Sequence, residues 1–262
     1  MRSNADLKSL PSNSRRIEEA GLNAMQTQRQ LFYDGWLLRV SAGSAKRARS
    51  VNAYFGSSLP LSRKIAHCED VYAHHGLPIL FRMTPFDCPA DLGDALAARG
   101  YEAFGETLVQ TVALDRPPEL PDAGEAIELD APDAPGFVDA VGELRGSAAP
   151  QRDAHLERLG NSVLETRFAV VRAAGRVVCT AQIAVENEVA GVFDVITASD
   201  ARGKGHATLA CASLLSWAWQ HGAQSAYLQV SADNAPAIAL YRKFGFATAY
   251  TYHYRGRPGA CE

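Results

Sequence analysis

Hydrophobic residues recur in two patterns along the C-terminal half of the chain, and the first pattern predicts neighbouring strands. Residues 167–172 and 177–185 are rich in β-branched and other apolar residues and flank Ala173-Ala174-Gly175, which predicts a β-hairpin. After a turn over 186–188, residues 189–197 predict a third strand. Consecutive strands joined by such short turns pair antiparallel, so the sequence predicts an antiparallel sheet here.

The second pattern is helical. Residues 205–221 are apolar on nearly every side, which predicts a deeply buried helix that ends at Gly222. The other elements predicted for this half are a strand near 126–129, helical segments between 134 and 160, a strand over 226–230, a helix over 236–244 and a strand over 248–254. Strands and helices in this order favour an α+β fold, in which helices pack on a mixed sheet.

The N-terminal half predicts a smaller α/β unit. Its predicted elements are a helix capped by Ser14 that runs to about Met25, a single strand over 31–40, a helix over 60–75, a strand over 79–84, a helix over 91–99 and a strand over 107–114. The proline-rich polar segment 115–124 is typical of a linker. We therefore predict two domains, residues 1–117 and residues 124–262.

Composition and charge narrow the function. A hydrophobic fraction of 47% and a charged fraction of 21% are those of an ordinary globular protein. The net charge of −3 provides no global positive field for nucleic acid or an anionic membrane, so neither is expected as a partner. Residues 1–16 lack the apolar core of a secretory signal, and we expect a cytoplasmic protein. The scattered cysteines contain no Cys-x-x-Cys pair, so no metal site is expected.

A glycine-containing loop stands between the third strand and the buried helix. It reads Arg-Gly-Lys-Gly-His-Ala over residues 202–207 and exposes backbone N–H groups at the positive end of the helix dipole, which suits a phosphate or pyrophosphate. Gly203 and Gly205 remove Cβ atoms that would block close approach, while Arg202 and Lys204 add positive charge. Glycines before a helix are also common as plain turn residues, so the loop alone does not decide the function.

A second motif follows the loop. It consists of Asn234, Ala237, Tyr241, Gly245 and Phe246. In this order, the loop and the second motif resemble the Gcn5-related N-acetyltransferase (GNAT) superfamily, whose signature is an R/Q-x-x-G-x-G/A loop followed by N-x-x-A-x-x-x-Y-x-x-x-G-F. The resemblance covers about residues 126–254. It departs at Ser199, where the superfamily commonly has a proline.

The resemblance implies a GNAT fold, a mixed and mostly antiparallel sheet flanked by helices, and direct transfer of the acetyl group of acetyl-CoA to a primary amine. The residues that it implies in cofactor binding are Val195, Ile196, Thr197, Arg202, Gly203, Lys204, Gly205, His206, Ala207, Asn234 and Tyr241. It also makes Tyr241 the general acid for the leaving thiolate, since a phenol with a pKa near 10 matches a thiol with a pKa of about 8.5. Taken alone, Tyr241 is better explained as a core tyrosine, and only the matched motif favours the catalytic role.

The general base, which takes a proton from the acceptor ammonium, is left open. Asp194, on the strand beside the loop, is the first candidate for this catalytic role, and Glu186 and Glu188 at the preceding turn are the others. Each carboxylate is as well explained by a salt bridge or by solvation, and a water relay is a further possibility.

Two other functions compete with acetyl transfer. A dinucleotide-binding oxidoreductase is suggested by Gly203 and Gly205, but Thr208 stands where the fingerprint has its third glycine. A catalytically silent CoA-binding or interaction module of the same fold is the second alternative. The acceptor is not readable from the sequence, and we expect a monomer or a homodimer.

The N-terminal half resembles, more loosely, the region before the catalytic domain in bacterial two-part GNAT proteins. The resemblance rests on three segments, which are residues 35–39, residues 46–52 and Arg99-Gly100-Tyr101. Leu96 stands where the repeat would place a counterpart of Tyr241, which implies a degenerate GNAT-like domain that shapes the acceptor cleft. The basic residues Lys46, Arg47 and Arg49 either form a solvated surface or recognise an acidic acceptor or a partner.

Overall fold

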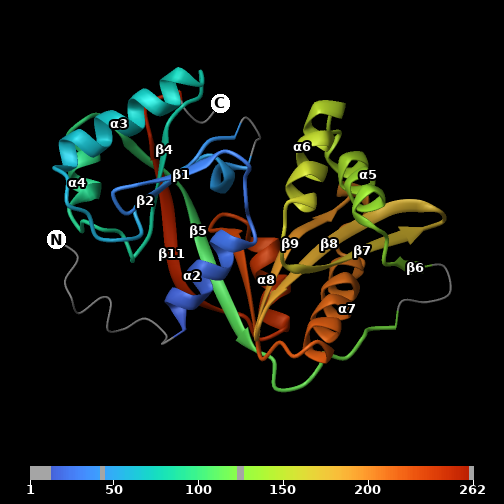
Figure 1. The fold of residues 1–262 in the computed structure, drawn as a ribbon. Coiled ribbons are helices and arrows are strands. Elements are labelled where there is room, and N and C mark those ends of the chain that lie inside the picture. The colour runs from blue at the N-terminus through green and yellow to red at the C-terminus, as the bar shows by residue number, and fades with distance from the viewer. Residues whose placement is uncertain (1–12, 42–44, 123–126, 260–262) are drawn as a thin grey trace.

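One long twisted sheet runs through the molecule. The computed structural model describes residues 13–41, 45–122 and 127–259. In these ranges the sheet has 11 strands in the order β1-β2-β3-β4-β11-β5-β10-β9-β8-β7-β6 (Figure 1). Ala126, the expected start of a strand, residue 124, the expected start of the second domain, and Cys261 lie outside the described residues.

The bounds of the elements follow. The strands are β1 (Gln30–Tyr33), β2 (Trp36–Arg39), β3 (Val51–Asn52), β4 (Leu80–Met83), β5 (Glu102–Ala113), β6 (Ile127–Asp130), β7 (Glu165–Ala173), β8 (Arg176–Glu186), β9 (Val189–Thr197), β10 (Ser225–Ser231) and β11 (Ala247–Gly256). The helices are α2 (Ser14–Asn23), α3 (Leu61–His74), α4 (Leu92–Ala97), α5 (Ala134–Arg145), α6 (Ala149–Gly160), α7 (His206–Gln220) and α8 (Ala235–Lys243), with short 3-10 helices η1 (Lys46–Ala48) and η2 (Ser199–Ala201).

The predicted antiparallel run in the C-terminal half is confirmed. β7, β8 and β9 form a meander, and β6 pairs antiparallel with β7 at its edge. The predicted buried helix is α7, which packs against this meander with its apolar residues inside one core cluster. Mixed sheet and packed helices confirm the predicted α+β class.

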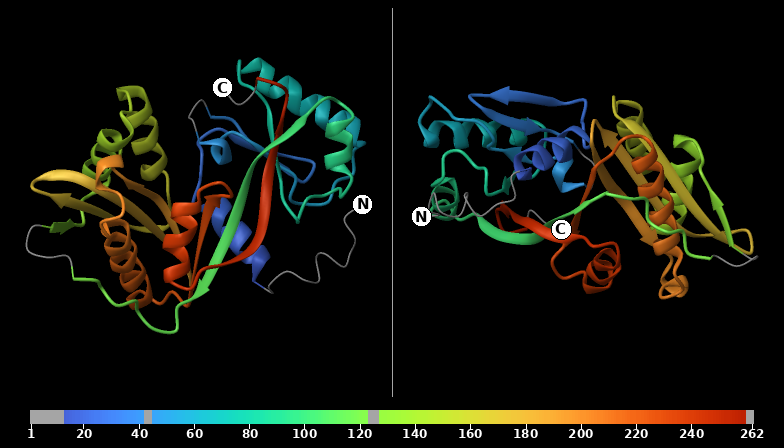
Figure 2. Two further views of the ribbon diagram at one scale, coloured as in Figure 1. Left: turned by 180° about the vertical axis from the view of Figure 1, so that it is seen from behind. Right: turned by 90° about the horizontal axis from the view of Figure 1, so that it is seen from below.

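The two halves exchange strands in the middle of the sheet. β11, the last strand of the chain, lies between β4 and β5, and β5 lies between β11 and β10. The chain therefore contains two strand–helix–strand units, β4–α4–β5 and β10–α8–β11, and the last strand of each unit is inserted between the two strands of the other unit. Figure 2 shows β5 and β11 running side by side in both views. β5 begins at Glu102 instead of Thr107 because its pairing with β11 extends to Gly256. The domain boundary at 117–124 stays a prediction.

The single strand predicted over 31–40 is wrong, because this segment is the hairpin of β1 and β2. Asp34 and Gly35 form its turn with φ values of 43° and 84°, the left-handed conformation that an Asp-Gly hairpin turn requires. A Cβ at position 35 would lie 2.3 Å from the carbonyl oxygen of Gly56, so glycine is needed there. The predicted cap at Ser14 is also wrong: Asn13 holds the cap position, and Ser14 is buried in the first turn of α2.

Helices cover the two faces of the central strands differently. Val192, Leu228 and Val230 pack in the core cluster of α7 and α8. Phe193 and Tyr227, one residue along each strand, belong to the cluster of α2. Because side chains alternate between the faces of a sheet, α2 lies on one face of β9 and β10 while α7 and α8 lie on the other.

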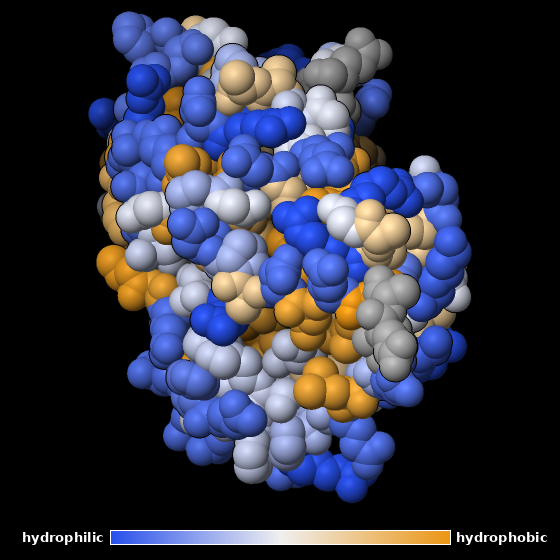
Figure 3. All heavy atoms as spheres, turned by 90° about the vertical axis from the view of Figure 1, so that its right-hand side faces the viewer, coloured by the Kyte–Doolittle hydropathy of each residue, from blue (hydrophilic) through white to orange (hydrophobic). Residues whose placement is uncertain are grey.

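The outer face near β6, β7 and α5 is mostly hydrophilic, with apolar side chains in small separate groups (Figure 3). Such a surface is normal for a protein in water. Among the described residues, no helix is long and apolar enough to cross a membrane.

Candidate active site

A gap between two parallel strands forms the centre of the candidate site. β9 and β10 pair from Val189 and Ser225 as far as Val192 and Leu228. Both strands continue beyond this last pair, to Thr197 and Ser231, so their carboxyl ends diverge. The predicted binding residues Val195, Ile196 and Thr197 lie on the diverging part of β9, where they are half-buried.

A β-bulge marks the start of the gap. Thr180 of β8 pairs with Ile196 and Gln182 pairs with Phe193, so that Asp194 and a second residue oppose a single residue of β8. Asp194 has a φ of 47°, a conformation that is rare outside glycine. The Thr180 hydroxyl donates to the Asp194 carbonyl oxygen over 3.1 Å and fixes the bulge. Backbone groups of a bulge lie outside the hydrogen-bond ladder of the sheet. Here the bulge is in the pairing of β8 with β9, and its backbone groups lie beside the gap.

The predicted phosphate-binding loop lies at the same end of the sheet. After β9 the chain passes through η2 and the loop into α7, and Gly205 is the residue before the first helical turn. Gly203 and Gly205 have φ values of 75° and 84°, and a Cβ on either would meet no atom within 4 Å. No side chain caps α7, so the N–H groups of its first turn are left for a ligand. Arg202 and Lys204 are exposed beside them, while His206 is buried.

Tyr241 of α8 reaches the site from the core cluster of α7. Its ring packs edge-on against Phe246 with the centroids 6.0 Å apart. Burial, followed by the neighbouring thiols of Cys211 and Cys179, raises the pKa of Tyr241 above its ordinary value of 10. Cys179 of β8 pairs with Thr197 at the diverging end of β9. Because Cys179 neighbours Tyr241, the neutral phenol of Tyr241 lies next to the gap.

Asn234 follows β10 and begins α8. Its side-chain oxygen accepts from the Ala237 N–H over 3.2 Å, which makes Asn234 the cap of α8. Because β9 and β10 are parallel, the helices that follow them, α7 and α8, both begin at the edge where the strands diverge. The predicted binding residues are thus brought together at one edge of the sheet from two separate segments of the chain.

Comparison with known proteins now decides the family. A family model described as "Probable histone acetyltransferase Rv0428c C-terminal" matches residues 11–255, nearly the whole chain.

The chain belongs to this acetyltransferase family.

Proteins similar to this chain include an N-acetyltransferase and solved structures with the GNAT fold. The chain is 26% identical over 244 residues to "Uncharacterized N-acetyltransferase YobR" of Bacillus subtilis (strain 168), covering 92% of this chain and 97% of that protein. The solved structure of a GCN5-related N-acetyltransferase from Kribbella flavida aligns with a TM-score of 0.71 at 16% identity, over 96% of this chain and 97% of that one. A tandem GNAT protein from the clavulanic acid biosynthesis pathway aligns with a TM-score of 0.62 at 17% identity, over 74% and 68% of the two chains. The predicted GNAT fold is therefore confirmed.

Within this GNAT site, the side chain of Asp194 lies against two arginines and a histidine. Arg145 lies 2.9 Å, His155 3.3 Å and Arg158 3.6 Å from its carboxylate oxygens. Burial alone would raise the pKa of Asp194, but His155, Arg158 and Arg145 together hold it well below the usual range. A carboxylate held in this way is a weak base, so the expected role of Asp194 as general base is poorly supported. It remains a prediction.

The other two candidate bases of the GNAT site lie at the turn between β8 and β9. The Glu186 carboxylate accepts from Arg16 over 2.8 Å and from Asn23 over 3.1 Å, which ties this turn to α2. The Glu188 carbonyl oxygen accepts from the N–H groups of Gln224 and Ser225. This turn lies at the paired end of β9, away from the gap.

Sequence reasoning missed several polar residues around the GNAT site. His155 and Arg158 of α6 were not distinguished, although their i, i+3 spacing places them on one face of a helix. Arg39 and Arg82 were also missed, because they lie in strands whose polar positions look solvent-facing. No group of three or more His, Cys, Asp or Glu that could hold a metal occurs in the described parts of the chain.

Proposed function

We propose that this protein is an N-acetyltransferase that moves the acetyl group of acetyl-CoA directly to a primary amine. The observation that carries the proposal is the gap between β9 and β10, with the uncapped start of α7 and the buried phenol of Tyr241 beside it. Its relatives are named N-acetyltransferases, which supports the same reaction.

The residues present fit acetyl-CoA. The first turn of α7 offers N–H groups at the positive end of a helix dipole, and Gly203 and Gly205 leave open space in front of them for a pyrophosphate. The Asn234 amide nitrogen stays available to a pantetheine chain, because the cap of α8 uses the oxygen. Acetyl-CoA supplies the activated thioester.

Backbone and side-chain groups of this chain would carry the remaining steps. The N–H groups at the bulge beside Val195 would polarise the acetyl carbonyl, which is electrostatic stabilisation by preorganised donors. Tyr241 would give its phenolic proton to the departing thiolate. The raised pKa of Tyr241 keeps the phenol protonated at neutral pH, and it also makes the phenol a weaker acid toward the thiolate than an ordinary tyrosine.

The N-terminal half would complete the acceptor side. α2 covers the face of β9 and β10 opposite to α7 and α8, so an acceptor amine that enters beneath α2 meets the thioester through the gap. This arrangement agrees with the proposal that the half is a degenerate GNAT-like domain. We further propose a cytoplasmic enzyme that works as a monomer or homodimer.

Acetyl-CoA binding tests the cofactor directly. Lys204→Glu, which reverses an exposed charge beside the pyrophosphate position, is expected to weaken acetyl-CoA binding about tenfold or more in calorimetry. Arg63→Glu, the same reversal on exposed α3, is the matched control and should bind like the wild type. Lys204 is preferred to Gly205, since any side chain at a φ of 84° adds strain of its own. A folded wild-type protein that does not bind acetyl-CoA would refute the proposal.

Asp194→Asn separates a structural role from a base role. We expect stability to fall by about 1–3 kcal/mol, because Arg145 and Arg158 lose their counter-charge and His155 loses its charged neighbour. The kcat should fall less than about tenfold, with an unchanged pH dependence, because the ion-paired carboxylate is too weak a base to matter. Kinetics from pH 5 to 9 provide the check. A loss of kcat above about a hundredfold, together with loss of the acidic limb, would restore Asp194 as the base.

The acceptor is the part of the proposal that the relatives constrain least. The family model is described as a probable histone acetyltransferase. A lysine-rich peptide is therefore one member of the amine panel with which the reaction should be assayed. The silent CoA-binding module is the alternative, and it predicts acetyl-CoA binding without turnover of any amine.

A further inference from the structure

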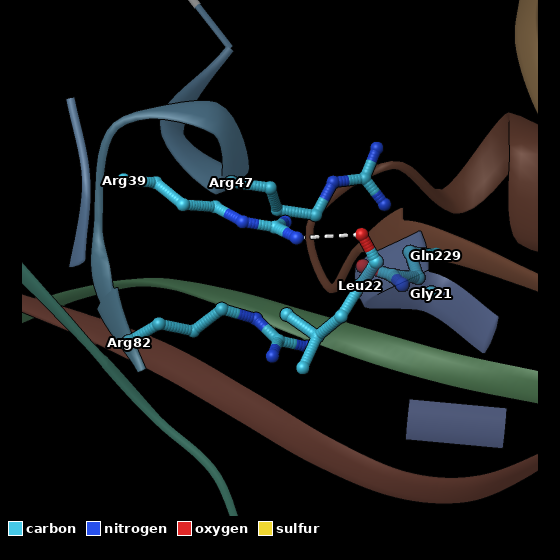
Figure 4. Close-up of a pocket in the computed structure, with 6 residues that line it drawn as sticks. All are labelled: Gly21, Leu22, Arg39, Arg47, Arg82 and Gln229. Atoms are coloured by element: carbon cyan, nitrogen blue, oxygen red, sulfur yellow. Dashed lines mark hydrogen bonds between the residues drawn. The ribbon is translucent and has the colours of Figure 1, made fainter. Parts of the chain in front are cut away.

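Three arginine side chains enter one hollow from three separate elements. Arg39 comes from β2, Arg47 from η1 and Arg82 from β4, and the hollow is closed by Gly21 and Leu22 of α2 and by Gln229 of β10. Figure 4 shows the three side chains running side by side toward α2 and β10. The hollow thus joins the N-terminal half to the strand that borders the gap.

The positive charge in this hollow exceeds its negative charge. Arg82 is paired with Glu18, whose carboxylate also accepts from the Tyr250 hydroxyl over 2.7 Å. Among the described residues, the Arg39 guanidinium donates to the Leu22 carbonyl oxygen alone, over 2.7 Å, and this oxygen carries no full charge. Among the described residues, Glu18 is the only carboxylate hydrogen-bonded to any of the three guanidinium groups, and Asp87 interacts with Arg82 without a hydrogen bond.

Several donors of these arginines have no partner. Arg39 is 3% exposed and Arg82 2% exposed, yet Nε and Nη1 of Arg39 and Nε of Arg82 make no hydrogen bond to any described residue. Nη1 of the half-buried Arg47 is also buried and has no hydrogen-bond partner in the part of the chain that the structure describes. Burial and the charge of Arg82 lower the pKa of Arg39 to about 10, so the group is still charged at neutral pH. Buried, unpaired guanidinium donors are costly unless an anion completes the site.

The hollow lies on the acceptor side of the gap. The Arg47 guanidinium carbon is 5.8 Å from the centroid of the Phe193 ring, which precedes the bulge at Asp194. Gln229 follows Leu228, the last residue of β10 that pairs with β9. Phe193 belongs to the cluster of α2, and the arginines line the hollow together with Gly21 and Leu22 of α2, on the face opposite to α7 and its glycine loop. The hollow is therefore separate from the proposed position of the pyrophosphate.

We propose that Arg39 and Arg47 bind an oxyanion group, a carboxylate or a phosphate, on the acceptor, which makes the acceptor a small amine with negative charge. This inference rests on the proposed function and names the substrate class for the same site. The side chains leave no space for a water molecule between them. An oxyanion therefore reaches the buried donors of Arg39 only when the side chain of Arg47, the least buried of the three, is displaced. Bidentate guanidinium pairing suits both carboxylate and phosphate.

Binding of simple anions tests the hollow without the cosubstrate. Inorganic phosphate and acetate are titrated calorimetrically into the wild-type protein and four variants: Arg47→Gln, Arg47→Lys, Lys204→Glu and Arg63→Gln. Arg47→Gln is expected to weaken the affinity for the bound anion about tenfold or more. Arg47→Lys should weaken it less, because lysine keeps the positive charge but cannot form the two parallel hydrogen bonds of a guanidinium group. Arg63→Gln should leave that affinity unchanged, while Lys204→Glu should weaken only the binding of phosphate at the glycine loop. Phosphate and acetate distinguish the two kinds of oxyanion.

The outcomes separate this inference from the proposed function. If the Arg47 substitutions leave anion binding unchanged and Lys204→Glu abolishes it, the anion binds at the glycine loop and the inference is wrong. Binding of neither phosphate nor acetate would also overturn the inference. Anion binding that depends on Arg47, in a protein that does not bind acetyl-CoA, would support the arginine site. The same result would contradict only the proposed acetyl transfer. Circular dichroism of each variant confirms that it is folded.

Turnover provides the second test. With acetyl-CoA, 2-aminoethyl phosphate should react with a kcat/KM at least about tenfold above that of ethanolamine, or glycine above glycinamide by the same factor. Arg47→Gln should erase this preference mainly through KM. A protein that prefers the uncharged amines or the lysine-rich peptide would contradict the inference, because the arginines repel cationic acceptors.

Discussion

Tyr241→Phe is expected to lower kcat about a hundredfold while acetyl-CoA binds with unchanged affinity. The substitution removes only the hydroxyl that would protonate the leaving thiolate, and the ring keeps its contact with Phe246. Steady-state kinetics and calorimetry on the same preparation measure the two quantities. Tyr33→Phe, in the N-terminal hairpin, is the control and should retain wild-type kcat.

The pH dependence sharpens this first prediction. Burial raises the pKa of Tyr241, so the phenol should stay protonated and the wild-type rate should not fall through ionisation of this group near pH 10. Wild-type and Tyr241→Phe rates should therefore differ by a similar factor between pH 7 and 9. Equal kcat values for the two proteins would show that Tyr241 packs in the core and takes no part in catalysis.

Glu18→Gln is expected to lower the free energy of unfolding by about 3–5 kcal/mol, the cost of breaking a buried ion pair from one side. Glu18 is 1% exposed, pairs with Arg82 and accepts from the Tyr250 hydroxyl. The amide cannot balance the charge of Arg82, and Arg39 stands beside it as a further cation. Urea unfolding measures the change, with the exposed Glu157→Gln as a control expected to stay within about 0.5 kcal/mol of the wild type.

The same ion pair predicts how stability depends on pH. Burial alone would raise the pKa of Glu18, but Arg82 and Tyr250 more than offset it and the folded-state pKa lies below the ordinary 4.5. The contribution of Glu18 is therefore complete above about pH 4.5 and is lost as the pH falls toward the folded-state pKa. Glu18→Gln should unfold with a weaker dependence on pH below 4.5 than the wild type. Identical acid profiles for the two proteins would contradict this role.

Much of the C-terminal half could be predicted from sequence because its structure is local. The hairpin at Ala173-Ala174-Gly175 and the buried helix after Gly205 depend on turn residues and on periodicity within a short window. The site residues from 195 to 207 are also close in sequence, so motif spacing was sufficient to bring them together.

The rest depends on contacts between distant segments. The pairing of β5 with β11 joins residues far apart in the chain, and no local pattern states which of several apolar strands will be neighbours. Arg82 looks like an ordinary polar position of a strand, and only the fold brings it against Glu18. The turn at Asp34-Gly35 is different, because the Asp-Gly signal was present and the apolar residues around it were given more weight.

Detection of an acetylated product tests the central claim most directly. The protein is incubated with acetyl-CoA and a panel of aminoalkyl phosphates, amino acids, neutral amines and a lysine-rich peptide, and mass spectrometry follows the products while a thiol reagent follows released CoA. The account predicts an N-acetylated amine formed in step with CoA release, and a much slower reaction with Tyr241→Phe. A folded protein that binds acetyl-CoA but acetylates no amine would contradict the account and leave the silent CoA-binding module in its place.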